Sequence, residues 1–491
     1  MARNILTLGG IFSIAVIILA IIYKKRLDNE LDSRLQDVLQ SLLRAERKAS
    51  VHPRTRVAVG FSLCSDSFAG GVELFRQLEQ EAPEQKRHID EIRTSQDLAE
   101  IFAYFFSTGA AAERYVHNRE LFRKIVKLSK QQAGHWSVVG GNAAVIANRL
   151  AIEGCDVLLG GRATPSTLQE FHQHVKGNSC LKTLVLTSVY RVVGEPVEED
   201  DVHVILEYKT GEQFGKYISP RANRFIIHSD IHNPYLSGLE EFQEELKYFN
   251  PQVVVLGGLQ MMDNFPFSEG EREARLEMQR AMILGLPSST PVHLELASFA
   301  EEALLHQLLE YVIPYSDSLG MNEQELPNLY SLLNYGNVSL VSDAYPRVAT
   351  MLDQIRSVYS ILRNQPQREG LRRVTRLHVH TLAFQAILTT EGSAWKNTMS
   401  AAAKASLTAH RHVCASSEVD MAKSRLIMDD SFSISQEDGS RKIPLEVDKP
   451  VSCWKEDDYE ICVAPVLVCT QVHRTAGGGD NISSAGLSVQ I

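Results

Sequence analysis

The side chains best suited to chemistry lie near the end of the chain, where three glycines precede an acid in the stretch Gly477-Gly478-Gly479-Asp480. Glycines let the backbone approach a ligand closely and direct successive N–H groups toward it. The small residues that follow predict a helix, whose N-terminus adds a partial positive charge. The pattern predicts a phosphate site in which Asp480 takes a proton from an attacking hydroxyl. A plain surface loop is the alternative interpretation of so short a motif.

Two further carboxylates stand in unusual positions. Glu295 lies inside an otherwise apolar predicted strand, where it needs a partner, a proton or a metal ion. A structural salt bridge would also satisfy it. Asn322 and Glu325 are three residues apart at a predicted helix start, which places both on one helical face. An ordinary capping box has the same spacing.

Several polar residues follow predicted strands or turns. Asn142 comes after the Gly140-Gly141 turn, where it could hydrogen-bond a ligand that approaches the backbone. Asp66 and Glu113 carry carboxylates, which accept hydrogen bonds from vicinal sugar hydroxyls. Arg224 stands beside an apolar run, and its planar guanidinium suits phosphate. The alternatives are a tight strand-to-helix turn at Gly140-Gly141, solvated side chains for the two acids, and a surface ion pair for the arginine.

The elements that must position these residues alternate between strand and helix. Short apolar runs predict strands at Val57–Leu63, Val157–Gly160, Thr183–Leu186, Val202–Tyr208, Val253–Leu256, Val292–Leu296 and Leu377–His380. Helical periodicity appears at Leu239–Phe249, Glu271–Leu284 and Glu301–Val312. The alternation predicts an α/β fold with a parallel sheet, helices on both faces, and ligands at the C-terminal ends of the strands. Residues 362–373 and 415–450 are polar and predict surface loops.

Bulk properties exclude some classes of function. The chain has 491 residues, which allows two or three domains or one large α/β domain with insertions. A net charge of −10 without a long basic tract argues against a nucleic-acid partner. Seven cysteines without metal-ligand spacing argue against a zinc site. The four late cysteines could hold one disulfide in an oxidising compartment.

The N-terminal segment differs from the rest. Residues 5–23 are uncharged and almost wholly apolar, and Lys24-Lys25-Arg26 follows them. This pattern predicts a signal anchor or signal peptide, and the basic flank without a clean cleavage site favours the anchor. Residues 24–53 predict an amphipathic helical linker that packs on the body or forms a short coiled coil. The remaining domain spans 54–491.

Eight motifs, in order along the chain, resemble the animal-type ADP-dependent glucokinases, which are ribokinase-like ADP-dependent sugar kinases. Each motif is weak alone, whereas the ordered set is specific and covers residues 54–491. The motifs are Cys64-Ser65-Asp66, Glu113-Arg114, Gly140-Gly141-Asn142, His203 to Glu207, Asn223-Arg224, His293-Leu294-Glu295, Asn322 to Glu325, and Gly477 to Asp480.

The resemblance implies a large α/β/α domain with a smaller, mainly β lid inserted in its N-terminal half. It implies transfer of the β-phosphoryl of ADP to the 6-hydroxyl of glucose, with Mg²⁺ as cofactor. By the same resemblance Asp480 is the base, Arg224 contacts phosphate, and Asn322 and Gly477–Gly479 bind nucleotide. Glu295, Glu325 and Asp480 hold the magnesium. The implied sugar site consists of Asp66, Glu113, Gly140, Gly141, Asn142 and His203.

Some positions bear on substrate preference. In the family a glutamate at Glu113 favours glucose, and the related phosphofructokinases lack it because it would crowd fructose 6-phosphate. Gly478, Ser62 and the stretch Gly257-Gly258-Leu259-Gln260 depart from the family pattern. The alternatives are an ADP-dependent phosphofructokinase, another sugar kinase, and a catalytically inactive, membrane-tethered sugar-binding protein.

The resemblance and the N-terminal segment together suggest the endoplasmic reticulum membrane or lumen, with a monomeric catalytic domain. If the domain is lumenal, we expect a disulfide between Cys414 and Cys469, because both stand near the late strands.

Overall fold

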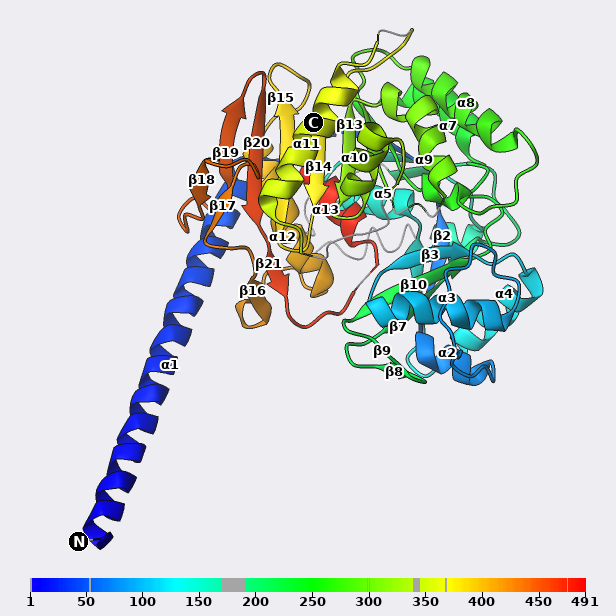
Figure 1. The fold of residues 1–491 in the computed structure, drawn as a ribbon. Helices are drawn as coiled ribbons and strands as arrows, with labels where there is room; N and C mark the ends of the chain where they lie inside the picture. Colours follow the sequence, from blue (N-terminus) through cyan, green and yellow to red (C-terminus); the bar gives the residue numbers. More distant parts are fainter. Residues whose placement is uncertain are drawn as a thin grey trace.

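The computed structural model describes residues 2–52, 54–169, 190–297, 299, 301–338, 345–366, 369–474 and 476–491. Its described part contains a ten-stranded sheet, a five-stranded sheet and three two-stranded ribbons. Figure 1 shows the large sheet and its helices as one body, the smaller sheet as a lid beside it, and the N-terminal helix projecting away.

The large sheet forms the core of the body. Its strand order is β19-β20-β15-β14-β13-β12-β11-β1-β5-β6. The strands from β14 to β6 pair in parallel, and β15, β20 and β19 add an antiparallel edge. Continuous apolar runs form the central strands because helices cover both of their faces. The bounds are β1 Arg56–Gly60, β5 Asp156–Gly160, β6 Tyr190–Val193, β11 Val253–Leu256, β12 Val292–Glu295, β13 Ser318–Asn322, β14 Arg376–His380, β15 Phe384–Thr390, β19 Ser452–Glu456 and β20 Tyr459–Pro465.

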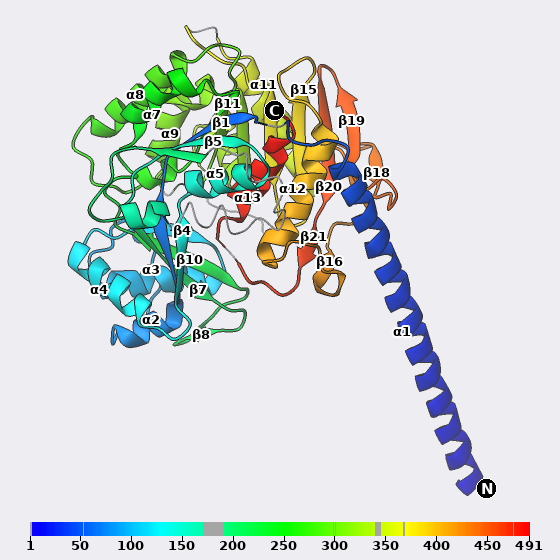
Figure 2. The same ribbon diagram turned by 180° about the vertical axis from the view of Figure 1, so that it is seen from behind.

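Helices form a layer on each face of this sheet. Alternate residues of β1 enter different clusters: Ala58 packs with α7 and its neighbours, whereas Val57 and Val59 pack with α5. Figures 1 and 2 show the two layers from opposite sides. The first layer holds α7 Leu239–Phe249, α8 Glu271–Leu284, α9 Glu302–Tyr311, α10 Glu325–Tyr335 and α11 Val348–Arg363; the second holds α5 Asn142–Ile152, α12 Thr398–Val413 and α13 Gly478–Ser488.

The lid is built from two separate segments of the chain. Its sheet has the order β3-β10-β7-β2-β4, and α2, α3 and α4 pack against it around a cluster rich in phenylalanine. Thr94 and Asp97 form a capping box that begins α3. The bounds are β2 Cys64–Gly70, α2 Gly71–Gln77, α3 Ser95–Thr108, β3 Ala112–Tyr115, α4 Arg119–Lys130, β4 Trp136–Gly140, β7 Val202–Tyr208, β8 Gln213–Phe214, β9 Tyr217–Ile218 and β10 Asn223–His228.

Most predicted elements are confirmed, with small changes at their ends. The helices Leu239–Phe249 and Glu271–Leu284 have the predicted bounds. The predicted strand Thr183–Leu186 lies outside the described residues. The prediction that 415–450 is loop throughout is wrong, because short elements occur there: η4 Met421–Lys423, β16 Ser424–Leu426, β17 Ser431–Ser433 and β18 Lys442–Pro444. β16 pairs with β21 (Leu467–Cys469), a distant partner that local polarity does not reveal.

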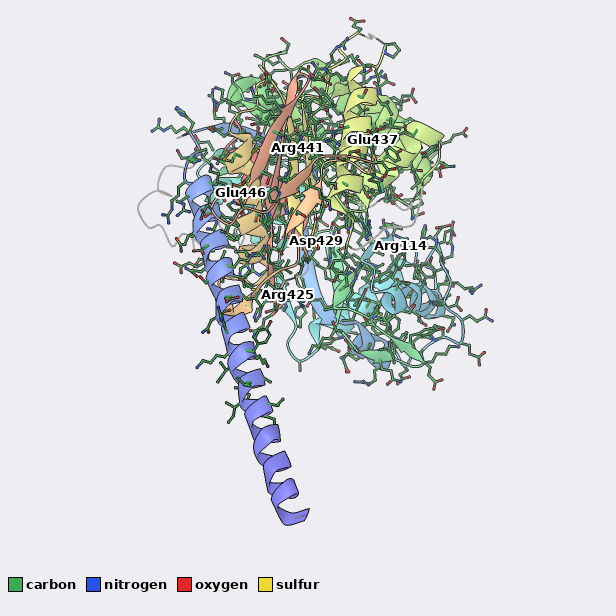
Figure 3. All side chains as sticks on the ribbon, turned by 60° about the vertical axis from the view of Figure 1, so that its left-hand side comes forward. Arg114, Arg425, Asp429, Glu437, Arg441 and Glu446 are labelled. Carbon is green, nitrogen blue, oxygen red and sulfur yellow. A yellow bond between two sulfur atoms is a disulfide. The ribbon has the colours of Figure 1, made fainter. Side chains whose placement is uncertain are left out.

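The N-terminal helix α1 runs from Ala2 to Glu46 without a break near residue 24. The predicted packing on the body is confirmed: Val38 and Leu42 are fully buried against α12 and its surroundings. Glu46 accepts two hydrogen bonds from Arg411. Figure 3 shows the charged segment that carries Arg425, Asp429, Arg441 and Glu446 near the body end of this helix.

No helix among the described residues combines the length and the hydropathy that crossing a bilayer requires. The expectation that residues 5–23 form a signal anchor or signal peptide stays a prediction.

The late cysteines form two disulfides, one more than expected. The predicted pair Cys414–Cys469 is confirmed, with an S–S distance of 1.90 Å. Cys453 and Cys462 form the second pair across the β19–β20 hairpin, where the register places them directly opposite each other. Cys64 and Cys155 are buried free thiols.

Candidate active site

The predicted site residues converge on one cavity between body and lid. Every one of them except Gly140 lines it. The body contributes the C-terminal ends of β12 and β13 and the start of α13, as expected for an α/β sheet. The lid contributes residues of β2, β3, β7 and β10.

The predicted glycine loop and helix are confirmed. Gly477 adopts a φ of +68° and precedes α13, so the loop turns sharply into the helix. Asp480 lies in the first turn and is 8% exposed. Asn142 donates from Nδ2 to both carboxylate oxygens of Asp480, at 3.2 Å each. Burial raises the pKa of Asp480 to about 7, and the charge of Glu295 adds to the rise. This carboxyl is therefore tuned to exchange a proton near neutral pH.

Glu295 is held by three donors. His380 Nε2 lies 3.0 Å from one carboxylate oxygen, and His293 Nε2 (3.0 Å) and Ser483 Oγ (2.5 Å) lie near the other. Burial would raise the pKa of Glu295, but the hydrogen bonds from the two histidines outweigh it and lower the pKa. Glu295 is therefore a fixed negative charge. A purely structural salt bridge does not account for its place on the cavity wall.

Asn322 and Glu325 form a reciprocal pair at the start of α10. The backbone N–H of Asn322 donates to Glu325 at 2.8 Å, and Asn322 Oδ1 accepts from the backbone N–H of Glu325 at 3.0 Å. The capping interpretation thus describes their geometry, and both still line the cavity. Burial raises the pKa of Glu325 to about 8. A nearby cation would favour its charged form.

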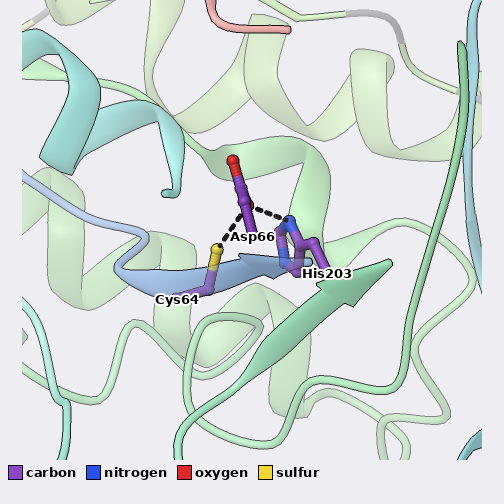
Figure 4. Close-up of side chains that lie close together, drawn as sticks. All are labelled: Cys64, Asp66 and His203. Carbon is purple, nitrogen blue, oxygen red and sulfur yellow. Dashed lines mark hydrogen bonds and ion pairs between the residues drawn. The ribbon is translucent and has the colours of Figure 1, made fainter. Parts of the chain in front are cut away.

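The lid side gathers a second group of acids around His203. His203 Nδ1 lies 3.6 Å from Glu113 and 3.9 Å from Asp66, and its Nε2 lies 2.9 Å from Asp230. Figure 4 shows Asp66 between His203 and Cys64, whose thiol donates to it at 3.3 Å. Burial lowers the pKa of His203, but Asp230 outweighs burial and raises it to about 10. The histidine is therefore a cation among carboxylates that face the cavity.

Gly140 and Gly141 make room for this group. A Cβ on Gly140 would lie 2.0 Å from Asp66 Cγ, so only glycine lets the carboxylate occupy its position. Gly141 has a φ of +91°, and a Cβ there would lie 2.6 Å from the Ser62 carbonyl oxygen. The two glycines act through their lack of a side chain; Gly141 also lines the cavity, whereas Gly140 does not.

Arg224 enters the cavity from β10. Its Nε is buried without a hydrogen-bond partner among the described residues, and its Nη1 donates to Asn223 at 3.3 Å. Burial lowers the pKa of Arg224, whereas the charges of Glu113 and Asp480 raise it. The alternative of a surface ion pair is wrong for the described structure, since none of its ion pairs includes Arg224. A buried guanidinium that lines the cavity with its Nε unpartnered suits an anionic ligand.

Sequence reasoning missed three residues that support the site. His380 and Ser483 hold Glu295, and Asp230 holds His203. One signal was available: His380 ends a predicted strand, and strand ends face the ligand in this kind of sheet. Asp230 comes two residues after the end of β10, but nothing local indicates that His203 is its partner.

The carboxylates fit a hard divalent cation. Oxygen ligands suit magnesium, and burial raises the pKa values of Glu325 and Asp480, so a cation held beside these two carboxyls would favour their charged forms. Within the described residues, the tight groups of metal-ligating side chains lie elsewhere, for example at Cys64, Asp66 and His203. Glu295, Glu325 and Asp480 are thus suited to hold an ion largely through its water molecules.

Known proteins are similar in sequence to this chain over most of its length. A family model, the ADP-specific phosphofructokinase/glucokinase conserved region, matches residues 55–489. An ADP-dependent glucokinase from Bos taurus is 34% identical over 438 residues, which cover 88% of this chain and 84% of that protein. A probable ADP-dependent glucokinase from Caenorhabditis elegans is 29% identical over 447 residues, with the same shares.

Solved structures share the fold. An ADP-dependent kinase in complex with fructose-6-phosphate and ADPβS superposes with a TM-score of 0.62 at 16% identity, covering 94% of this chain and 98% of that one. A hypothetical ADP-dependent phosphofructokinase from Pyrococcus horikoshii OT3 gives 0.58 at 17% identity, covering 89% and 98%. The predicted ribokinase-like fold is confirmed, and with the family match over residues 55–489 the chain belongs to the ADP-specific phosphofructokinase/glucokinase family.

Proposed function

We propose that the protein transfers the β-phosphoryl group of ADP to the 6-hydroxyl of glucose, giving glucose 6-phosphate and AMP. One observation carries the proposal: Asp480 stands where the glycine loop and helix N-terminus of the body meet the acidic lid side of the same cavity, which Asp66 and Glu113 line. Of the two relatives described above, one is named ADP-dependent glucokinase and the other probable ADP-dependent glucokinase.

Each group of cavity residues has a separate role in the proposed phosphoryl transfer. Asp480 accepts the proton of the attacking hydroxyl, and its pKa near 7 suits that role. Backbone N–H groups at Gly477–Gly479 and the guanidinium of Arg224 stabilise the negative charge on the phosphoryl group. The glycine loop and Asn322 contact the nucleotide. Lid residues hold the sugar so that its hydroxyl, rather than water, reaches the phosphorus.

Magnesium is the proposed cofactor. Glu295, Glu325 and Asp480 would hold it, and it would neutralise charge on the phosphates of the nucleotide. His293, His380 and Ser483 keep Glu295 oriented and ionised for this purpose.

The charge of the lid side favours a neutral sugar. Asp66 and Glu113 present carboxylate oxygens to the cavity, which accept hydrogen bonds from hydroxyls but repel a phosphate group. His203 is already paired with Asp230. Glucose is therefore preferred to fructose 6-phosphate as the acceptor, and the phosphofructokinase alternative has no observation of its own in its favour.

The test uses the purified full chain with Mg²⁺ and glucose, with ADP or ATP as donor. We expect glucose 6-phosphate and AMP from ADP, and no transfer from ATP. Asp480→Asn should lower kcat by about 10²–10⁴-fold, the usual contribution of a general base. Asp420→Asn is the control, because Asp420 caps the short helix η4 and does not line the cavity. Transfer from ATP alone would refute the choice of donor, and glucose binding without transfer would support the sugar-binding alternative.

A location in the endoplasmic reticulum is also a proposal. Its supports are the apolar run 5–23 and the two disulfides, which form in oxidising compartments. The sequence Asn337-Val338-Ser339 matches the acceptor motif for N-glycosylation, so we expect a lumenal body to carry at Asn337 a glycan that Asn337→Gln removes. If wild type and Asn337→Gln from expressing cells migrate equally on a gel because neither carries a glycan, the proposal of a lumenal body is contradicted.

A further inference from the structure

Gln260 lines the cavity and has no role in the function proposed above. It lies in η2 (Leu259–Met262) and is 4% exposed. The turn before it requires glycine, because Gly258 has a φ of +82° and a Cβ there would lie 2.3 Å from Ser62 Cβ. This turn brings the Gln260 side chain to the wall that it shares with Asp480.

A row of hydrogen bonds joins Asp480 to Glu113 through two amides. Asn142 donates from Nδ2 to Asp480, which leaves its Oδ1 to accept from Gln260 Nε2 at 2.5 Å. The same Nε2 lies 3.4 Å from a carboxylate oxygen of Glu113. Carboxylates only accept, and each amide has one donating end. The acids at the two ends therefore fix which way both amides point.

This direction leaves the side-chain carbonyl of Gln260 unused. Its Oε1 is buried and has no hydrogen-bond partner in the described part of the chain. Buried acceptors in native proteins are nearly always satisfied, and each exception needs an explanation. The neighbouring Glu113 also presents acceptor oxygens, whereas a sugar hydroxyl brings a proton to donate.

We propose that Gln260 is a specificity-determining residue of the sugar subsite. Its NH₂ group holds Asn142 and Glu113 in position, and its Oε1 accepts a hydrogen bond from one hydroxyl of an unphosphorylated hexose. The inference rests on the proposed function and adds to it a contact that selects for one hydroxyl. Because the row ends at Asp480, sugar binding through Gln260 also fixes the amide that orients the base.

The test compares wild type with Gln260→Met, which keeps the length of the side chain and removes both hydrogen-bonding groups. Both proteins are given glucose and its 1-, 2-, 3- and 4-monodeoxy analogues, with ADP and Mg²⁺. Wild type should lose about 10- to 100-fold in kcat/KM on the analogue that lacks the contacted hydroxyl. Gln260→Met should lose a similar factor on glucose and nothing further on that analogue. The KM for ADP should change by no more than about twofold.

Two further variants separate recognition from general damage. Gln279→Met is the matched control, since Gln279 is also buried and its side-chain oxygen likewise has no partner among the described residues, yet it lines no part of the cavity. It should leave sugar selectivity unchanged. Gln260→Glu places a carboxylate against Asn142 Oδ1 and Glu113, and should raise the KM for glucose more than Gln260→Met does. Thermal unfolding reports whether each variant is folded.

Equal losses in both proteins on every analogue would overturn the inference, and so would a change confined to the KM for ADP. Calorimetric titration with the same sugars, which needs no turnover, decides the case if transfer fails. Wild type that binds glucose without phosphorylating it would refute the proposed function, while the analogue affinities of the two proteins would still decide the role of Gln260. Wild type that binds no hexose would refute both.

Discussion

Replacing Asn142 by aspartate should damage the enzyme more than removing the side chain altogether. Asn142 Nδ2 lies 3.2 Å from both carboxylate oxygens of Asp480. Asn142→Asp keeps the shape but places a carboxylate oxygen where a donor stood. Asn142→Ala only deletes the donor.

The distance sets the size of the effect. Two unit charges 3.2 Å apart repel by about 5 kcal/mol at an effective dielectric constant of about 20, which corresponds to a rise of about four in a pKa. Burial and Glu295 already raise the pKa of Asp480 to about 7, so the base of Asn142→Asp should stay protonated at neutral pH. Losing the donor alone costs about 1–3 kcal/mol. We therefore expect kcat to fall about 10³-fold or more in Asn142→Asp, and about 5- to 150-fold in Asn142→Ala.

The assay is AMP formation at saturating glucose and ADP from pH 6 to 10. The rate of Asn142→Asp should rise steeply toward pH 10, because a base with a strongly raised pKa ionises only there. The rate of Asn142→Ala should rise less and at lower pH, because this variant loses only the hydrogen bond by which Asn142 lowers the pKa of Asp480. Asn118→Asp is the control, since Asn118 caps α4 on the lid and aspartate caps equally well. If Asn142→Asp is as active at pH 7 as Asn142→Ala, the assignment of this contact to the base is wrong.

Two other predictions test the supports of the site. In Gly479→Ala the new Cβ would lie 2.8 Å from His380 Cε1, so kcat should fall by at least about 10-fold, whereas Gly478→Ala meets nothing nearer than 3.9 Å and should stay within about threefold of wild type. Burial lowers the pKa of His203, but its pairing with Asp230 raises it to about 10, above the ordinary 6.5. The stability from this pair is complete below pH 6.5 and lost as the pH rises through 10, so Asp230→Asn should lower Tm more at pH 6 than at pH 10. An equal drop in Tm at both pH values would contradict the pairing.

The local sequence pattern alone predicts two kinds of site residue: glycines that shape the backbone, and a charged residue within an apolar strand. The glycine loop and its acid at residues 477–480 are contiguous, and Glu295 stands out because an acid within an apolar strand is costly. The parallel sheet is also predictable from the sequence, since continuous apolar runs that alternate with helices are typical of buried parallel strands. Alternatives for each motif were open until the fold brought residues from distant strands to one cavity.

The parts that sequence reasoning missed depend on long-range partners. His380 is 85 residues from Glu295, and no periodicity connects them. The place of Gln260 in the site depends on its hydrogen bond to Asn142, which is 118 residues away and which the local sequence does not predict. The second disulfide was missed because it depends on the register of the β19–β20 hairpin, which places Cys453 opposite Cys462. Each of these contacts is a product of tertiary pairing rather than of local preference.

The most direct measurement follows the phosphoryl group itself. The full chain is incubated with Mg²⁺, glucose and ADP labelled with ³²P at the β-phosphate, and the products are separated. We expect the label to leave ADP and appear in glucose 6-phosphate in step with unlabelled AMP, and to stay in ADP with Asp480→Asn. Label that appears only in inorganic phosphate, or glucose 6-phosphate that forms only when ATP is supplied, would contradict the proposal that this cavity transfers the β-phosphoryl of ADP to glucose.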